Sequence, residues 1–252
     1  MNPMFDLSGK CAIVTESTRG IGRAIAEAMI GAGARVAISS EDAGDTARVA
    51  AELGQPGICA DVADDAALAR LVDGTLAAFG GLDILVCNAG ITGRHGPFAE
   101  VDMDDYAHVM AVNLRSQVVL CNLALPHIAA RGGGSVTLIA SISALRGNGR
   151  INAYALAKAG VAQLARNLAV EWGPRNIRAN AIAPGFIDTE LAIPLLKDPT
   201  FLQRRMAMTP LRRPGKPEEI GGTAVFLASP AGAFVTGQTI AVDGGTVITD
   251  GS

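Results

Sequence analysis

Short apolar runs alternate with longer helical segments along the whole chain, and this alternation limits the fold more than any other feature. Most of the short runs are rich in branched side chains and lack polar alternation, which is typical of strands covered on both faces. Repeated strand–helix–strand units predict a parallel sheet with right-handed crossovers. We therefore expect an α/β fold with a doubly wound, parallel, seven-stranded sheet. The expected strands are residues 11–15, 35–39, 57–61, 84–89, 135–141, 178–183 and 239–242.

Helical segments are expected between these strands. Asp64 and Asp104 suit helix N-caps, and Gly54 and Gly80 suit helix ends. No linker divides the chain, so all 252 residues are expected to form a single domain. Proline and charge gather in one long irregular stretch at 187–216, and a loop of that size in a compact domain is usually functional. The expected helices are residues 20–32, 43–53, 64–79, 104–130, 153–172 and 217–229.

The charge balance excludes one class of partner. The chain has 21 Lys and Arg against 24 Asp and Glu, a formal net charge of −3. It has no basic stripe with interleaved aromatic residues, so no nucleic acid partner is expected. The most apolar region, 116–130, is interrupted by Asn122, Pro126 and His127, and we expect no membrane span there. The first residues contain no long apolar stretch, so no signal peptide is expected either.

Cysteine and histidine usage points to a cytoplasmic protein without a metal. The four cysteines are scattered with no C-x-x-C pair, and three lie in apolar runs, which indicates buried free thiols in a reducing compartment. His95, His108 and His127 form neither H-E-x-x-H nor a Cys/His cluster, so no metal site is expected. A G-x-S-x-G elbow for Ser-His-Asp hydrolysis is absent from the sequence.

A glycine-containing turn joins the first expected strand to the first expected helix. It runs from Thr15 to Gly22 and includes Gly20. Glycines at such a turn let the backbone approach a pyrophosphate, and the helix N-terminus supplies N–H donors and partial positive charge. The turn is consistent with nucleotide binding, and a plain strand–helix turn is the alternative.

Four further side chains could carry chemistry. Tyr154 and Lys158 lie on the same face of a helix, where an ammonium lowers the pKa of a phenol and makes it a usable proton donor or acceptor. Ser141 ends an expected strand, at the edge where open α/β sheets bind ligands. Asn113 lies inside an expected helix, where Asn is mildly unfavourable and a side-chain role is invited. Taken singly, each also has an ordinary structural interpretation.

The motifs together follow the order and spacing of one family. T-x-x-x-x-G-I-G, N-A-G at 88–90, Asn113, Ser141, Y-x-x-x-K and the Pro-Gly pair at 184–185 make the chain resemble the short-chain dehydrogenase/reductases over essentially its whole length. The resemblance implies a Rossmann-type fold. It also implies an NAD(P)-dependent oxidoreductase that transfers hydride reversibly between the nicotinamide and a small-molecule carbonyl or secondary alcohol.

The same resemblance implies residue roles. Tyr154 is the general acid/base, Ser141 holds the substrate oxygen, and Asn113 keeps a water in the proton relay. Lys158 lowers the pKa of Tyr154 and binds the nicotinamide ribose. The 187–216 segment is implied to be a mobile lid over the substrate. The implied cofactor-binding residues are Thr15, Ser17, Arg19, Gly20, Ile21, Gly22, Ser40, Glu41, Asp61, Val62, Asn88, Ala89, Gly90, Tyr154, Lys158, Pro184, Gly185, Ile187 and Thr189.

Three positions depart from the family pattern. Glu16 replaces the first glycine of the turn, and its carboxylate can hydrogen-bond a ribose hydroxyl, crowd it or point to solvent. Cys87 replaces the first Asn of N-N-A-G and is expected to pack without a redox role. Ser40 holds the usual NAD-selecting acidic position, followed by Glu41. Arg19 favours the 2′-phosphate of NADP, whereas Glu16 and Glu41 oppose it, so NAD is favoured over NADP.

Other functions and the substrate stay open. A regulatory or scaffold protein that binds the cofactor with little catalysis is one alternative, and dehydration or epimerisation is another. Apolar side chains within and just before 187–216 favour a fairly apolar substrate region, whereas the cations of that segment are expected to be solvated. The resemblance also implies a homotetramer, assembled through the helices of Asn113 and Tyr154 and the C-terminal segment. The apolar residues are Phe186, Leu191, Ile193, Leu195 and Leu196, and the cations are Arg204, Arg205, Arg212 and Arg213.

Overall fold

A parallel sheet forms the centre of the protein in the computed structural model, which describes residues 2–249. The strand order is β2-β1-β3-β4-β5-β6, and every neighbouring pair is parallel. This order reverses direction between β1 and β3, as the doubly wound prediction requires. The strands are β1 (Cys11–Val14), β2 (Arg35–Ile38), β3 (Ile84–Cys87), β4 (Gly134–Ile139), β5 (Ile177–Pro184) and β6 (Thr239–Val242).

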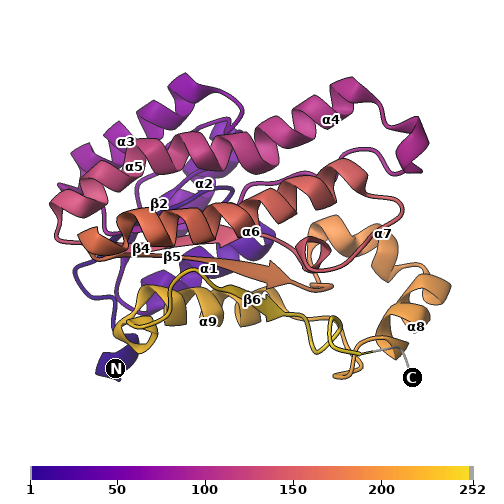
Figure 1. The fold of residues 1–252 in the computed structure, drawn as a ribbon. Coiled ribbons are helices and arrows are strands. Elements are labelled where there is room, and N and C mark those ends of the chain that lie inside the picture. Colours follow the sequence, from indigo (N-terminus) through magenta and orange to yellow (C-terminus); the bar gives the residue numbers. More distant parts are fainter. Residues whose placement is uncertain (1, 250–252) are drawn as a thin grey trace.

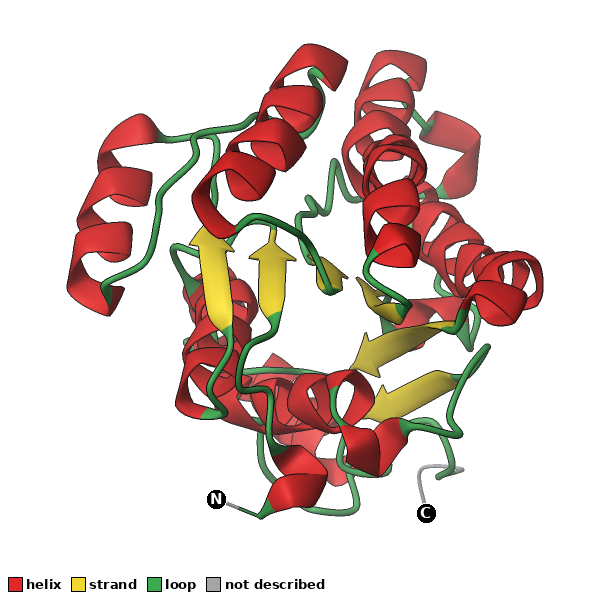
Figure 2. Ribbon diagram, turned by 90° about the vertical axis from the view of Figure 1, so that its left-hand side faces the viewer, coloured by secondary structure: helices red, strands yellow, loops and turns green. Residues whose placement is uncertain are grey.

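Helices cover both faces of the sheet (Figures 1 and 2). One face packs α3, α5 and α6 into one hydrophobic cluster, and the other packs α1, α2 and α9 into a second. Strands β1 and β3 are buried throughout, which explains their uninterrupted apolar sequence. The helices are α1 (Gly20–Gly31), α2 (Ala43–Leu53), α3 (Asp65–Phe79), α4 (Met103–Met110), α5 (Ser116–Ala130), α6 (Asn152–Trp172), α7 (Ile193–Leu196), α8 (Pro199–Ala207) and α9 (Pro217–Ala228).

The sheet has six strands among the described residues, so the prediction of a seventh at 57–61 is wrong. That segment runs beside β2 but forms only one bridge, between Gly57 and Ile38. Backbone hydrogen bonds continue from the Ile58 N–H to the Ile38 carbonyl and from the Ala60 N–H to the Ser40 carbonyl, each at 2.9 Å, and the chain after Ser40 then turns toward α2. There the Ser40 hydroxyl contacts the Asp42 carbonyl at 3.2 Å and Thr46 Oγ1 at 3.0 Å.

The long predicted helix at 104–130 is divided into three parts. A π-helical turn at Ala111–Arg115 separates α4 from α5. The prediction of Asp104 as the N-cap is wrong. Asp102 takes that place, accepting the Asp104 and Asp105 N–H groups at 3.0 and 3.3 Å. By length and composition the Met103–Ala130 stretch could cross a membrane, but half of its apolar window is buried inside the protein.

Other helix ends and the cysteines agree with the predictions. Asp64 caps α3 by accepting the Ala66 N–H at 2.9 Å. Gly54 and Gly80 end α2 and α3 in the left-handed conformation. All four cysteines are free; Cys59 is exposed and the other three are buried.

The 187–216 segment is more regular than predicted, because it contains α7 and α8. Its two ends are joined at the base. The Asp188 N–H donates to the Gly215 carbonyl at 2.8 Å, and the Gly215 N–H donates to the Phe186 carbonyl at 2.9 Å. The segment therefore leaves and rejoins the domain at one point, near the carboxyl end of β5.

Candidate active site

The carboxyl ends of four neighbouring strands bring the predicted site residues together. Thr15 follows β1, Asn88 follows β3, Ser141 lies just beyond β4, and Pro184 ends β5. These strands are adjacent in the order β1-β3-β4-β5. Residues far apart in the sequence therefore meet at one edge of the sheet, beside the point where the strand order reverses, where open α/β folds bind ligands.

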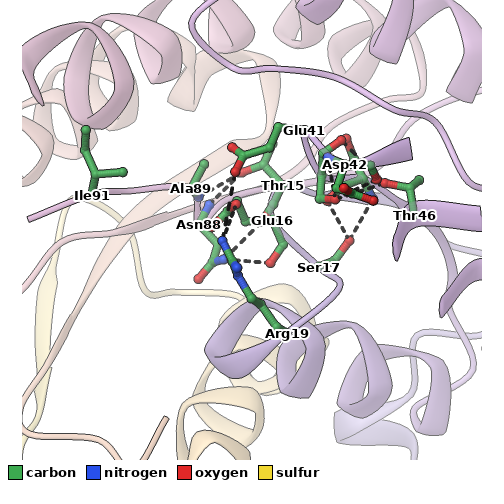
Figure 3. A network of polar contacts seen from close by, with 12 residues as sticks. Thr15, Glu16, Ser17, Arg19, Glu41, Asp42, Thr46, Asn88, Ala89 and Ile91 are labelled. Carbon is green, nitrogen blue, oxygen red and sulfur yellow. Dashed lines mark hydrogen bonds and ion pairs between the residues drawn. The ribbon is translucent and has the colours of Figure 1, made fainter. Parts of the chain in front are cut away.

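Thr15 and Asn88 fasten the glycine-containing turn to the end of β3 (Figure 3). The buried Thr15 hydroxyl accepts the Asn88 and Ala89 N–H groups at 2.9 and 3.1 Å. In return the Asn88 side-chain amide donates to the carbonyls of Thr15 and Glu16 at 3.0 and 3.2 Å. The turn is thus held in one shape by side chains that the sequence assigned to the cofactor.

The start of α1 fits a bound pyrophosphate. A Cβ on Gly22 would lie 1.9 Å from the Glu16 carbonyl oxygen, so only glycine allows this fold of the turn. Gly20 has a φ of 53°, in the left-handed region that favours glycine. Helix α1 has no side-chain N-cap and no acidic residue in its first turn, so its N-terminus keeps its donors and positive potential. Ile21 instead packs against the core.

Asn113 lies in the π-helical turn, fully buried, and pairs with the backbone of Ile91. Its Oδ1 accepts the Ile91 N–H and its Nδ2 donates to the Ile91 carbonyl, each at 2.8 Å. Its own carbonyl accepts the Gln117 side-chain amide at 2.9 Å. Such π turns frequently occur at functional sites. Here the hydrogen bonds of Asn113 hold the loop that follows β3 against the turn between α4 and α5.

Lys158 is buried and is held by a backbone carbonyl. Its Nζ donates to the Ile139 carbonyl oxygen at 2.7 Å. Burial lowers the pKa of Lys158 to about 8, partly offset by Cys87. A Cβ on Gly90 would lie 3.2 Å from Lys158 Nζ and 3.3 Å from Asn113 Oδ1, so these three predicted residues converge.

Tyr154 completes the predicted set, one helical turn before Lys158 on α6. The Lys158 Nζ lies 5.6 Å from the centre of the Tyr154 ring. Burial raises the pKa of Tyr154, and a hydrogen bond with Ser141 lowers it in part. The predicted lowering of this pKa by Lys158 does not appear; Ser141 exerts the lowering effect instead. Ser141 also accepts the Ser143 N–H at 3.1 Å, which fixes its hydroxyl at the end of β4.

Glu16 adopts a strained conformation at the other end of the site. Its φ is 51°, a value that suits the glycine expected there. Arg19 lies between two acids, 3.6 Å from Glu16 and 4.0 Å from Glu41 (Figure 3). Burial raises the pKa of Glu16, and Arg19 opposes this effect. The carboxylate thus forms an ion pair with Arg19, a partner that none of the three interpretations from the sequence included.

Several predicted cofactor residues make contacts within the protein. Ser17 Oγ accepts the Ser39 N–H at 2.8 Å, which ties the turn to the end of β2. The Ser40 hydroxyl is buried at the start of α2, as described above. Asp61 Oδ1 accepts the Ala63 N–H at 2.8 Å, and Val62 is buried beside it.

The residues after β5 lie against the same turn. A Cβ on Gly185 would lie 2.6 Å from the Asp243 Cα, so the two chain segments approach closely at this glycine. Ile187 is buried and forms a bridge with Gly215. A Cβ on Gly20 would lie 3.6 Å from Thr189 Cγ2. The start of the 187–216 segment therefore lies close to the start of α1, with room for no more than a small side chain between them.

Sequence reasoning missed the backbone partners of the site. Nothing in the sequence marks the Ile139 carbonyl or the Ile91 peptide as ligands of Lys158 and Asn113. It also treated Arg205 as solvated, which is wrong: this side chain is half-buried, and burial lowers its pKa. The Arg205 guanidinium lies 5.9 Å from the ring of Phe186, which is far from it in the sequence, so no local pattern marked this environment.

A separate cavity of about 490 Å³ lies on the outer side of α6. Arg146, Asn152 and Leu156 are among its lining residues, whereas Tyr154 and Lys158 are not. Its position on the other side of the helix excludes it as the space in which these two side chains would act.

Comparison with known proteins agrees with the geometry. A family model described as enoyl-(acyl carrier protein) reductase matches residues 16–247. A cis-4-hydroxycyclohexanecarboxylate dehydrogenase from Sinomonas cyclohexanicum is 38% identical, covering 94% of this chain and 96% of its own. The structure of a gluconate 5-dehydrogenase from Burkholderia cenocepacia J2315, in complex with NADP and tartrate, has a TM-score of 0.94 at 34% identity, covering 98% of each chain. That of a 7α-hydroxysteroid dehydrogenase with NADH and 7-oxo glycochenodeoxycholic acid has a TM-score of 0.92 at 36% identity, covering 97% of each.

The fold and the site therefore define an oxidoreductase built on a dinucleotide-binding sheet. The chain belongs to the short-chain dehydrogenase/reductase family. It is an NAD(P)-dependent enzyme that acts on a small-molecule substrate.

Proposed function

We propose that the protein interconverts a carbonyl compound and a secondary alcohol, with Tyr154 as the general acid and base. The observation that carries this proposal is the convergence of Tyr154, Ser141 and Lys158 at the carboxyl end of β4, beside the glycine-containing turn. A phenol that hydrogen-bonds a serine hydroxyl is placed to share one substrate oxygen with it.

Each residue has a separate task in this proposal. Ser141 donates to the substrate oxygen and keeps it beside the Tyr154 hydroxyl, which gives or takes the proton. Lys158 binds the nicotinamide ribose and places a positive charge near Tyr154. Asn113 holds a water for the proton relay while its amide secures Ile91. The bound nicotinamide supplies the hydride chemistry itself.

The acids around Arg19 support a preference for NAD over NADP. A 2′-phosphate needs a free cation, and Arg19 is already within 4.0 Å of two carboxylates. Glu41 is exposed at the same place, with its side chain 63% accessible, where it would repel a phosphate. A ribose 2′-hydroxyl, in contrast, can donate to either acid.

The 187–216 segment is proposed to be a lid over the substrate within the single domain. The hydrogen bonds that join its two ends, and the position of Thr189 close to Gly20, support a movement coupled to cofactor binding. The aromatic pair Phe186 and Phe201, with ring centres 5.6 Å apart, supports an apolar body in the substrate. By name, one relative acts on a hydroxycyclohexanecarboxylate and another on gluconate, and both compounds contain a secondary alcohol, which supports the proposed reaction.

Exposed apolar side chains support assembly into a homotetramer. Val118 on α5 and Leu156 on α6 are exposed, on the helices through which the family is expected to associate. Phe234 and Ile248, in the C-terminal segment, are exposed as well. A mass near that of one chain in light scattering would contradict this assembly.

The free state of all four cysteines supports a cytoplasmic location, because reducing compartments keep thiols free.

Turnover assays test the activity. Carbonyl compounds are screened with NADH and NADPH, and Tyr154→Phe is compared with the parent on the best substrate. We expect the variant to bind cofactor normally and to lose about 100-fold or more in kcat, since it lacks the transferable proton. Near-normal turnover by the variant would reject Tyr154 as the acid/base. Cofactor binding with no turnover on any compound would favour a regulatory or scaffold role.

A further inference from the structure

Arg205 is half-buried, and its guanidinium has no hydrogen bond or ion pair with the described residues 2–249. It lies in the last turn of α8, where its own carbonyl accepts the Thr209 hydroxyl at 3.0 Å. Thr209 in turn contacts Thr246 Oγ1 at 3.0 Å, which fastens this end of the lid to the C-terminal segment. The Arg205 Nε is buried and has no hydrogen-bond partner. A buried charged donor held in this way is placed to bind an acceptor.

The side chain is held at the substrate edge of the sheet. Its guanidinium carbon lies 5.9 Å from the ring of Phe186, which comes two residues after the end of β5. Asp243 follows the end of β6, and Arg146 follows Ser141 and the short helix at its side. The contact with Phe186 thus places the Arg205 guanidinium near the carboxyl end of β5, next to β4, beyond whose end Ser141 lies.

The charges at this place leave an excess of positive potential. Burial lowers the pKa of Arg205, the nearby charge of Arg146 lowers it further, and Asp243 raises it. The Asp243 carboxylate is already engaged, because its two oxygens accept the Gly245 and Val247 N–H groups at 2.8 and 2.7 Å. Asp243, the acid near this cation, thus binds backbone donors and leaves the buried Arg205 Nε without a partner, an arrangement that attracts an oxyanion.

We propose that Arg205 binds an oxyanion on the substrate, a carboxylate or a phosphate ester, and thereby selects anionic carbonyl compounds and alcohols. Phe186 and Phe201 form an apolar wall next to this cation, so the substrate combines an apolar body with a charged end. The inference rests on the proposed carbonyl–alcohol activity and adds the substrate class to it. A planar guanidinium suits either anion, because it offers paired donors.

Matched substrates test the proposal. The parent enzyme is assayed with 4-oxocyclohexanecarboxylate and with its neutral methyl ester. We expect kcat/KM to be at least about tenfold higher for the acid, because a hydrogen-bonded charge pair contributes binding that the ester lacks. In Arg205→Gln, kcat/KM for the acid should fall about 10- to 100-fold, chiefly through KM, with less than about a threefold change for the ester. Arg204→Gln, an exposed neighbour on the same helix, is the control and should change neither.

Inhibition of the parent enzyme gives a second readout that needs no variant. Benzoate, phenyl phosphate and benzyl alcohol are compared as competitive inhibitors of reduction of the methyl ester. Tighter inhibition by benzoate identifies a carboxylate site, and tighter inhibition by phenyl phosphate identifies a phosphate site. Equal turnover of acid and ester with equal inhibition by all three compounds would overturn the inference while leaving the proposed activity intact. Cofactor binding without reduction of either ketone, or of any in the broader screen, would instead reject the proposed activity.

Discussion

Asn113 and Ile91 exchange two hydrogen bonds, each 2.8 Å long, between a side-chain amide and a backbone peptide. The amide satisfies both polar groups of Ile91 after the end of β3, at a place where β3 can no longer supply a ladder partner. The π-helical turn at Ala111–Arg115 is what brings Asn113 to this position. The geometry of the site thus depends on an irregularity in a long helix.

Asn113→Ala should therefore lower the free energy of unfolding by about 2–4 kcal/mol, because it leaves the Ile91 N–H and carbonyl without partners. Asn122→Ala is the control, since Asn122 is exposed on α5, and it should change stability by less than about 0.5 kcal/mol. Urea denaturation measures both. Equal stability of the two variants would show that solvent replaces the amide at Ile91.

The strands and helix ends were predictable from the sequence where a single local property, such as apolar character or a glycine, determines the structure. Buried strands such as β1 and β3 need continuous apolar residues, and Gly54 and Gly80 end helices because they adopt the left-handed conformation. The segment at 57–61 has the same apolar character but lies beside β2 without a full ladder. Composition cannot distinguish these cases, because every residue carries the backbone groups that form a ladder, and their pairing depends on how the segment lies against β2.

The candidate site was predictable only through its side chains. Tyr154, Lys158, Ser141 and Asn113 stand out by type and spacing, and the structure brings them together. The groups that hold them are peptide atoms, such as the Ile139 carbonyl, and every residue has those. The partial burial of Arg205 could not be predicted for a similar reason, because it depends on how α8 packs near Phe186. Such contacts depend on three-dimensional packing and leave no local pattern.

Lys158 should make stability depend on pH in the alkaline range. Burial lowers its pKa from 10.5 to about 8, so between these values the unfolded chain binds more protons than the folded one. The free energy of unfolding then rises with pH across that window. Replacing Lys158 with Met should remove about 2 kcal/mol of this rise. Urea denaturation at pH 7.5 and pH 10 measures the difference between parent and variant.

Lys197→Met is the matched control for that experiment, because Lys197 is exposed. It should leave the parent's pH dependence unchanged. A Lys158→Met variant that keeps the full alkaline rise would show that Lys158 stays charged in its buried position.

Glu16 should cost the protein stability through both its backbone and its carboxylate. Glu16→Gly removes the strain of a φ of 51° and should raise the free energy of unfolding above that of Glu16→Ala by about 1 kcal/mol. Both variants lack the carboxylate, so their difference isolates the backbone effect.

The carboxylate of Glu16 adds a dependence on pH. Burial raises the pKa of Glu16, so the parent loses stability as the pH rises through the pKa of Glu16 in the folded state. Either variant should therefore gain more stability over the parent at pH 7 than at pH 4. Thermal melts at both pH values measure these gains, and a larger gain at pH 4 would contradict the prediction.

Glu41→Arg should change the cofactor preference toward NADPH. The substitution removes an acid that lies 4.0 Å from Arg19 and adds a second cation at the same exposed place, so a 2′-phosphate gains a partner and loses a repulsive neighbour. We expect the ratio of kcat/KM for NADPH to that for NADH to rise by about tenfold or more, the effect of one charge-assisted contact. Asp73→Arg makes the same change of charge at an exposed position on α3 and should leave the ratio within about twofold. If the two variants alter the ratio equally, the net charge of the protein, and not the position of Glu41, governs its choice between the two cofactors.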